Sequence, residues 1–234
     1  MQNIVTVKWG TKYGSEYVNK LHNMISRTAR VPFNITCFTD DPVGILSGIK
    51  ILPLNNDLPT WWNKVYLFCE QNGLRPGEQY LYLDLDTLIT GDISPLIEYD
   101  GDFLILRDFG VVKEPDSFRG YESRFGSAIM SWKHGVWSGL WEAFDSHKDM
   151  WMRTCEGDQN FLEQVIDHKA VDIVQEKWPG WARSYKYECY NEVPEDTRIV
   201  CFHGRPSIPE AMNETIEVYG ETFEPRKWVE EAWK

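Results

Sequence analysis

The chain has 234 residues, a length that favours one large domain over two independent ones. Hydrophobic residues make up 42% and charged residues 26% of it, and the mean hydropathy is -0.44, so the composition excludes disordered, collagen-like and membrane-embedded classes. The formal charge of -12 gives no general attraction for nucleic acid or anionic lipid, so a polyanionic ligand needs a local cationic feature such as a bound metal ion.

Apolar spacing along the chain predicts an alternation of strands and helices. Strands are predicted at 4–8, 34–39, 50–54, 79–83, 103–107, 128–132 and 198–202, and helices at 15–28, 62–71, 136–144 and 158–167. This alternation predicts an α/β sandwich, with a mostly parallel central sheet flanked by helices, over residues 1–209. Residues 210–234 carry seven Glu against three Lys or Arg and predict an acidic helical tail in solvent.

The most informative stretch is the apolar run Tyr-Leu-Tyr-Leu that ends in Asp84-Leu85-Asp86. Because strand side chains alternate between faces, Asp84 and Asp86 point the same way. The carboxyl ends of strands border the ligand crevice in open α/β sheets, so the pair lies where a ligand is expected. Carboxylate oxygens suit Mg²⁺ or Mn²⁺, although two aspartates in water at a strand end are an equally common arrangement.

A phosphatase of the haloacid dehalogenase type also places Asp-x-Asp at a strand end. That pattern has Thr or Val four positions after the first Asp and usually opens the chain. Here the position is Leu88, Thr87 comes one residue early, and the motif lies more than a third of the way along. The phosphatase therefore stays only a minor alternative.

A second motif, Cys201-Phe-His203-Gly-Arg205-Pro, also follows a predicted strand. The imidazole of His203 is a candidate third ligand for the same metal, and the guanidinium of Arg205 is a candidate phosphate ligand. A lone His at such a place is more often structural. If neutral His203 holds the metal, donor affinity should decline as the pH falls through about 6.

The cysteines and the amino terminus bear on the cellular compartment. The five cysteines form no Cys-x-x-Cys pair, which favours reduced thiols. The first residues lack the basic and apolar regions of a signal peptide, and no apolar stretch approaches the roughly 18–20 residues that cross a bilayer. We expect a cytoplasmic protein, with peripheral membrane contact left open.

These features in this order resemble a family, the GT-A glycosyltransferases related to family 8, in particular small bacterial or phage-type members. The resemblance covers residues 1–209 and rests on the Tyr-Leu-Asp-x-Asp strand end, a basic residue about 20 positions earlier, an Asp-Gln step and the His-Gly loop. It implies a GT-A fold and transfer of a sugar from a nucleotide diphosphate donor, UDP in the first place, with Mn²⁺ or Mg²⁺ and with retention at the anomeric carbon. The acceptor is a saccharide, a lipid-linked molecule or a protein, and the oligomeric state stays open.

The resemblance also assigns site residues. It implies metal ligation by Asp84, Asp86 and His203, and contact of Asp84 with the ribose or donor sugar. It implies stacking of Tyr13 on the base, with Lys8 nearby in place of a usual Asp. Lys64 would lie near the donor, and Asp158 and Gln159 would line the donor sugar in catalysis. Where the family's late loop has a diphosphate-binding Lys this chain has Ser207, so Arg205 is the candidate replacement.

A different class of function stays open beside the transferase. A non-catalytic protein that binds nucleotide sugars or carbohydrates on the same fold would explain the departures at Gly126 and Ser207. Four tryptophans are candidates for stacking on an acceptor, although burial is the commoner fate of each: Trp61, Trp62, Trp178 and Trp181.

Overall fold

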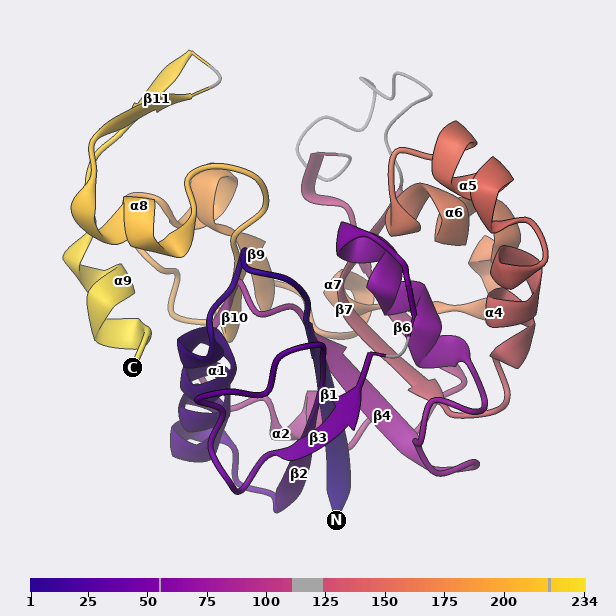
Figure 1. Ribbon diagram of the computed structural model, residues 1–234. Helices are drawn as coiled ribbons and strands as arrows, with labels where there is room; N and C mark the ends of the chain where they lie inside the picture. Colours follow the sequence, from indigo (N-terminus) through magenta and orange to yellow (C-terminus); the bar gives the residue numbers. More distant parts are fainter. Residues whose placement is uncertain (55, 111–123, 219) are drawn as a thin grey trace.

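The computed structural model describes residues 1–54, 56–110, 124–218 and 220–234, and within them a central sheet has seven strands (Figure 1). Their order is β3-β2-β1-β4-β7-β6-β8. Strand β7 is antiparallel to both of its neighbours, and all other pairings are parallel, which confirms the predicted mostly parallel α/β sheet. The strands are β1 (Gln2–Lys8), β2 (Phe33–Thr39), β3 (Lys50–Pro53), β4 (Gln79–Leu83), β6 (Phe103–Arg107), β7 (Phe125–Lys133) and β8 (Asp172–Ile173).

Strand β1 lies at the point where the order of the sheet reverses. It pairs in parallel with β2 on one side and with β4 on the other, where Asn3 aligns with Tyr80 and Val5 with Tyr82. The segments that follow β1 and β4 therefore turn to opposite sides of the sheet. A crevice forms between these two segments at the carboxyl ends of the strands. The Asp pair directly follows β4 and so borders this crevice.

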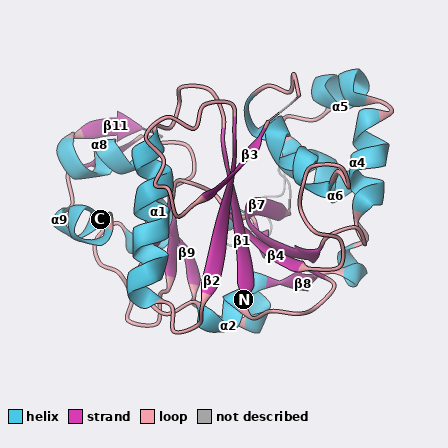
Figure 2. Ribbon diagram, turned by 60° about the horizontal axis from the view of Figure 1, so that its bottom comes forward, coloured by secondary structure: helices cyan, strands magenta, loops and turns pink. Residues whose placement is uncertain are grey.

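Helices cover both faces of the sheet, as Figure 2 shows. Helix α1 (Ser15–Thr28) has the predicted bounds and buries Val18, Leu21 and Ile25 against one face. The other face is covered by η1 (Thr60–Phe68), α4 (Ser138–Asp145) and α6 (Asp158–Val165), with α5 (Lys148–Thr154) outside them. Short helices complete these layers: α2 (Ser94–Ile97), η3 (His168–Ala170), α7 (Val174–Lys177) and η4 (Tyr185–Cys189).

A small second sheet connects the two sequence motifs. It has the order β5-β10-β9, formed by β5 (Thr87–Ile89), β10 (Ile199–Cys201) and β9 (Ala182–Ser184). Strand β10 is antiparallel to β5, with Cys201 aligned to Thr87. Because β5 begins just after Asp86 and β10 ends just before the His-Gly loop, this pairing brings the two motifs to one end of the small sheet.

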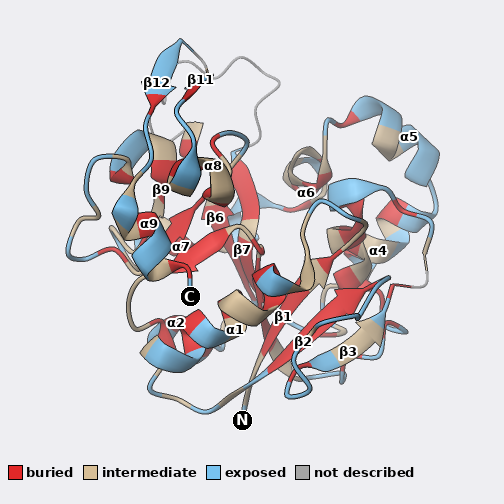
Figure 3. Ribbon diagram, turned by 60° about the vertical axis from the view of Figure 1, so that its left-hand side comes forward, coloured by how far each residue is buried: buried red, intermediate tan, exposed pale blue. Residues whose placement is uncertain are grey.

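The last 25 residues are not the exposed helical tail expected from their charge. They form α8 (Ile208–Asn213), the hairpin of β11 (Ile216–Val218) and β12 (Glu221–Phe223), and α9 (Lys227–Ala232). Phe223, Val229 and Trp233 are buried, and the ring centroid of Trp233 lies 5.0 Å from that of Tyr17 in α1. Figure 3, coloured by burial, shows buried and intermediate stretches among the exposed ones of this segment. The apolar residues of this acidic segment thus belong to the same core as α1.

Two further expectations can be compared with the described residues. All five cysteines are buried and free of disulfides. Within the described ranges no helix is both long and apolar enough to cross a bilayer. The largest local difference is η1, which was expected as an α-helix over 62–71 and is instead a 3₁₀-helix that begins two residues earlier.

Candidate active site

A cavity of about 500 Å³ opens at the carboxyl ends of β1 and β4. Its walls come from the loop after β1, η1, the ends of β4 and β7, the start of α6 and the loop after β10. Eight of the residues proposed from sequence are among those that line it, namely Tyr13, Trp61, Lys64, Asp84, Asp86, Asp158, Gln159 and His203. Residues spread over 190 positions of the chain thus share one cavity.

The two aspartates at the end of β4 accept hydrogen bonds from opposite sides of the cavity. Asp84 accepts from the hydroxyl of Tyr82 at 2.5 Å through Oδ1 and from Nζ of Lys64 at 2.9 Å through Oδ2. Asp86 accepts from the hydroxyl of Tyr13 at 2.6 Å. Burial and the charge of Asp84 raise the pKa of Asp86, although the bond from Tyr13 opposes this. A cation placed between the carboxylates would relieve that repulsion.

Lys64 lies between two acidic side chains from different elements. Its Nζ is 2.9 Å from Asp84 and 3.8 Å from Oδ2 of Asp158, and it donates to Oγ of Ser127 at 3.0 Å. Burial works to lower the pKa of Lys64, but Asp158 and Asp84 together raise it, so the side chain carries a full positive charge. Burial also raises the pKa of Asp158, whose Oδ2 accepts no hydrogen bond.

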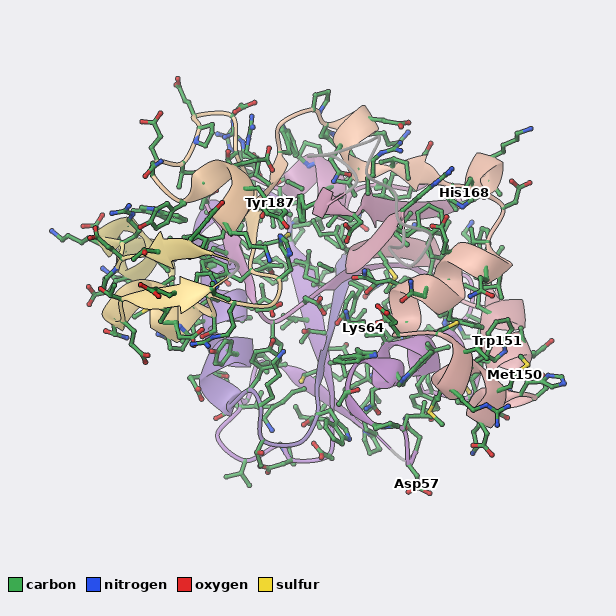
Figure 4. All side chains as sticks on the ribbon, turned by 90° about the horizontal axis from the view of Figure 1, so that it is seen from above. Asp57, Lys64, Met150, Trp151, His168 and Tyr187 are labelled. Carbon is green, nitrogen blue, oxygen red and sulfur yellow. The ribbon has the colours of Figure 1, made fainter. Side chains whose placement is uncertain are left out.

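The 3₁₀ geometry of η1 aims two side chains at the cavity. With three residues per turn, side chains three apart lie in one row. The row of Trp62, Val65 and Phe68 is buried in the core, whereas the row of Trp61 and Lys64 lines the cavity. In Figure 4 Lys64 lies near the middle of the molecule, while Trp151 and Met150 of α5 lie at its edge.

The entry to η1 is strained. Thr60 has φ of 48° in the left-handed region, which costs a β-branched residue about 1–3 kcal/mol. The buried amide of Asn63 donates to the carbonyl of Leu58 at 2.8 Å and to that of Thr60 at 3.0 Å. These bonds hold the backbone on both sides of Pro59 and keep Thr60 in place.

His203 lines the cavity but is engaged on another side. Its Nε2 shares a hydrogen bond of 2.7 Å with Oγ of Ser184, and its ring stacks on Phe109 with centroids 5.3 Å apart. Burial, with a smaller contribution from the charge of Lys186, lowers the pKa of His203 to about 3. The decline in donor affinity that we expected near pH 6 therefore has no titrating imidazole behind it.

The predicted trio of metal ligands is not assembled. In the described part of the chain no three His, Cys, Asp or Glu side chains gather closely enough to hold one ion. The carboxylates of Asp84 and Asp86 do fit a divalent cation, because both are hard oxygen donors of one cavity, where burial and then the charge of Asp84 raise the pKa of Asp86. His203 does not complete a group of three with them among the described residues. Its Nε2 is shared with Ser184, which leaves Nδ1 as the other nitrogen donor of the ring, so metal ligation by His203 stays a prediction.

Two residues expected at the donor lie outside the cavity lining. Arg205 pairs with the carboxylate of Glu210, which also accepts from the backbone and hydroxyl of Ser207 in the capping box of α8. The side chain of Lys8 is 3% exposed, with its Nζ 3.9 Å from Asp41. Alternation along β1 explains this, because Val7 faces the cavity and Lys8 faces the other way.

Other cavity residues escaped the sequence analysis. Lys12 lines the cavity next to Tyr13, with its Nζ 4.6 Å from the centre of that ring. Asp108 and Glu156 add two carboxylates. Tyr82 could have been found, because it precedes Asp84 by two positions on the same strand face, whereas the others occupy loops without periodicity.

Comparison with known proteins places the fold. Neither a protein-family model nor a curated protein matches the sequence. Among solved structures, the chain is similar to the galactosyltransferase LgtC, crystallised with donor and acceptor sugar analogs, with a TM-score of 0.65 and 11% identity over 88% of each chain. It is also similar to the glycosyltransferase GlyE of Streptococcus pneumoniae TIGR4, with a TM-score of 0.65 and 13% identity. That alignment covers 100% of this chain and 60% of GlyE.

A third similar structure is the bifunctional glycosyltransferase WbbM, with a TM-score of 0.57, 10% identity, and coverage of 88% of this chain and 46% of WbbM. These identities are low, so the likeness concerns the fold. The α/β sandwich with its mostly parallel sheet and flanking helices is the GT-A fold of these glycosyltransferases.

Proposed function

We propose that this protein is a glycosyltransferase that takes a sugar from a nucleotide diphosphate donor, with UDP as the nucleotide. One observation carries the proposal: a single cavity at the reversal point of a GT-A sheet holds Lys64, Asp84, Asp86, Asp158 and Gln159. Ligands of open α/β sheets bind at that point, and these side chains suit a sugar and an anionic leaving group.

The charge of the cavity supports a divalent metal as part of the proposal. Among the described residues, five carboxylates and two lysines line it. Lys64 is already balanced by Asp84 and Asp158, so a diphosphate entering alone would meet net negative charge. Asp84 and Asp86 would hold Mn²⁺ or Mg²⁺, which stabilises negative charge on a diphosphate leaving group when bound.

The chain's own residues divide the remaining work. Tyr13 presents a ring beside Asp86 for the nucleotide, and Lys12 supplies an exposed ammonium at the same wall. Lys64 fixes the orientation of Asp84 and Asp158 by pairing with both, and its charge favours negative charge that develops on the leaving group. Asp158 and Gln159, at the first turn of α6, are placed to accept and donate hydrogen bonds to sugar hydroxyls.

The alternatives receive less support. A phosphatase has no support from the glycosyltransferase folds described above. One observation favours a non-catalytic binder of nucleotide sugars. Arg205 and Ser207, the residues at the positions expected to contact the diphosphate, both hydrogen-bond to Glu210 instead. Release of UDP from a UDP-sugar distinguishes the transferase, which turns the donor over, from this binder, which does not.

The test is a panel of nucleoside diphosphates and UDP-sugars, with and without Mn²⁺, read by thermal shift and then by release of UDP. We expect stabilisation by UDP and a UDP-sugar that depends on Mn²⁺, at roughly 2–4 kcal/mol for ligand at 100 to 1,000 times its dissociation constant. Asp86→Asn should lower that metal-dependent affinity by about 10- to 100-fold, because it removes a carboxylate donor.

Asp145→Asn is the matched control, since it removes one exposed carboxylate of α4 outside the cavity. Stabilisation by UDP with equal strength in Asp86→Asn would overturn the metal assignment, and no response to any nucleotide would overturn the proposed function. Tight binding without release of UDP from any donor would favour the binder. NMR of the first product anomer tests the retention that we include in the proposal.

A further inference from the structure

Two tryptophans, Trp9 and Trp61, are among the described residues that line the cavity, and of these Trp61 is exposed whereas Trp9 is partly buried. The side chain of Trp61 is 49% exposed, whereas the adjacent Trp62 is 4% exposed and stacks on Phe144. The other two candidates, Trp178 and Trp181, stack on each other at 5.7 Å and are absent from the cavity lining. A large indole left half in water at the wall of a cavity favours a ligand surface over a packing role.

The backbone holds this indole in place. Thr60, directly before it, keeps a left-handed φ of 48°, and the buried amide of Asn63 clamps the carbonyls of Leu58 and Thr60. Strained backbone of this kind persists only where the surroundings enforce it, and it clusters at ligand sites. The ring of Trp61 is therefore presented by a rigid segment.

The position of the ring is also fixed from the side of α6. A Cβ at Gly157 would lie 2.8 Å from Nε1 and 3.1 Å from Cδ1 of Trp61, so the indole edge approaches this residue as closely as only glycine allows. Gly157 is the N-cap of α6 and directly precedes Asp158 and Gln159. The exposed ring thus adjoins the polar groups that we assign to sugar hydroxyls.

Tyr13 and Trp61 lie on different walls of the cavity, and we assign a different ligand to each wall. Tyr13 and Lys12 stand beside Asp86, on the wall assigned to the nucleotide, whereas Trp61 stands beside α6. A pyranose stacked on an aromatic ring presents its C–H face to the ring and its hydroxyls to the sides. Glu156 lines the cavity just before α6 and suits those hydroxyls, next to the Gln159 assigned to the donor sugar.

We propose that Trp61 is the stacking platform for a pyranose of the acceptor, and that this acceptor sugar is uncharged. The five carboxylates of the described lining outnumber its two lysines, so the cavity is net negative and disfavours a uronic or sialic acid relative to a neutral sugar. This inference rests on the proposed glycosyl transfer, and it adds the acceptor class, a saccharide with a neutral pyranose.

The test observes the Trp61 indole directly. The protein is labelled with ¹⁵N, and its indole resonance is identified by its loss in Trp61→Phe. The probes are methyl β-glucoside, methyl β-galactoside and the methyl glycoside of glucuronic acid, each titrated in the presence of UDP and Mn²⁺. We expect at least one neutral glycoside to shift the Trp61 resonance in a saturable manner, and the glucuronide to bind at least about fivefold more weakly.

Three variants sharpen the result, and their binding is followed by the backbone amide resonances of the ¹⁵N-labelled protein because two of them lack the Trp61 indole. Trp61→Phe keeps an aromatic face and should retain most binding of the neutral glycoside, whereas Trp61→Leu should lose about fivefold or more. Gly157→Ala should also weaken binding, because its methyl group displaces the intact ring. Equal binding by Phe and Leu variants would overturn the stacking role, and tighter binding of the glucuronide would overturn the uncharged acceptor.

The wild-type titrations keep the two proposals apart. If UDP binds but neither neutral glycoside shifts the Trp61 resonance, the platform is wrong while the donor site stands. If a glycoside shifts that resonance and no nucleotide binds, the platform stands and the transferase does not. If neither occurs, both are wrong.

Discussion

The end of β4 and the end of β10 meet the same cavity but use their charged residues differently. At β4, Asp84 and Asp86 contact Lys64 and Tyr13, which lie 20 and 73 positions away and also face the cavity. At β10, Arg205 pairs with Glu210 five positions later, and His203 shares a hydrogen bond with Ser184. Both strand ends thus have hydrogen-bond partners, but those of Asp84 and Asp86 line the cavity themselves, whereas Glu210 and Ser184 lie outside its lining.

The largest expected effect concerns the β4 side. In Lys64→Met, Asp84 and Asp158 lose their shared cation while staying largely buried, so the free energy of unfolding should fall by about 3–5 kcal/mol. Urea unfolding at pH 7 without metal measures this loss.

The double variant Lys64→Met with Asp158→Asn should recover part of that stability, because one uncompensated buried charge is removed. If the double variant is no more stable than Lys64→Met alone, the three side chains are not coupled as the distances indicate. The single Asp145→Asn substitution gives the reference for removing an exposed carboxylate.

An intermediate effect concerns the β10 side and depends on pH. Because burial lowers the pKa of His203 to about 3, the folded protein keeps this imidazole neutral while the unfolded chain protonates it below about pH 6.5. The unfolded state then binds more protons, so His203 stabilises the fold less as the pH falls, by at most about 1.4 kcal/mol per pH unit.

Urea unfolding of the metal-free protein and of His203→Gln at pH 7, 6 and 5 measures the difference. Wild-type stability should decrease with acid relative to the variant. Asp86 and Asp158, whose pKa values are raised by burial, work in the opposite direction, but both proteins contain them and the difference isolates His203. Parallel curves for the two proteins would contradict the buried neutral imidazole.

The smallest expected effect compares two cations. Lys12→Ala should weaken UDP binding by about fivefold at low salt and less at high salt, because this side chain is exposed and its charge is screened. Arg205→Ala should change the affinity less, because its guanidinium is already paired with Glu210. Calorimetric titration at two salt concentrations measures both, and a larger loss in Arg205→Ala would reverse the assignment of the two strand ends.

Several features of fold and site were accessible from sequence because they depend on local periodicity. The bounds of α1 and β4 follow directly from the spacing of their apolar residues. Alternation also placed Asp84 and Asp86 on one side of the chain. The same rule, applied to β1, would have shown that Val7 and not Lys8 faces the cavity.

Other features were not accessible because they depend on contacts between distant segments. The acidic segment from 210 to 234 has no strong periodicity of its own, and its burial follows from packing of Trp233 on Tyr17. The 3₁₀ winding of η1 was missed for another reason, since the bonds of Asn63 to Leu58 and Thr60 are local but leave no periodic pattern of apolar residues that separates a 3₁₀-helix from an α-helix.

The sequence by itself determined the alternation of strands and helices and the pair of carboxylates that closes β4, because both follow from the period of side chains along a single segment. Only the tertiary structure decided which charges reach the cavity. Lys64 lies between Asp84 and Asp158 because a charged group leaving water is stabilised by the nearest opposite charge, and the fold sets which charge is nearest. Arg205 stays half-exposed and pairs with Glu210 five positions later, and the fold leaves both outside the cavity lining.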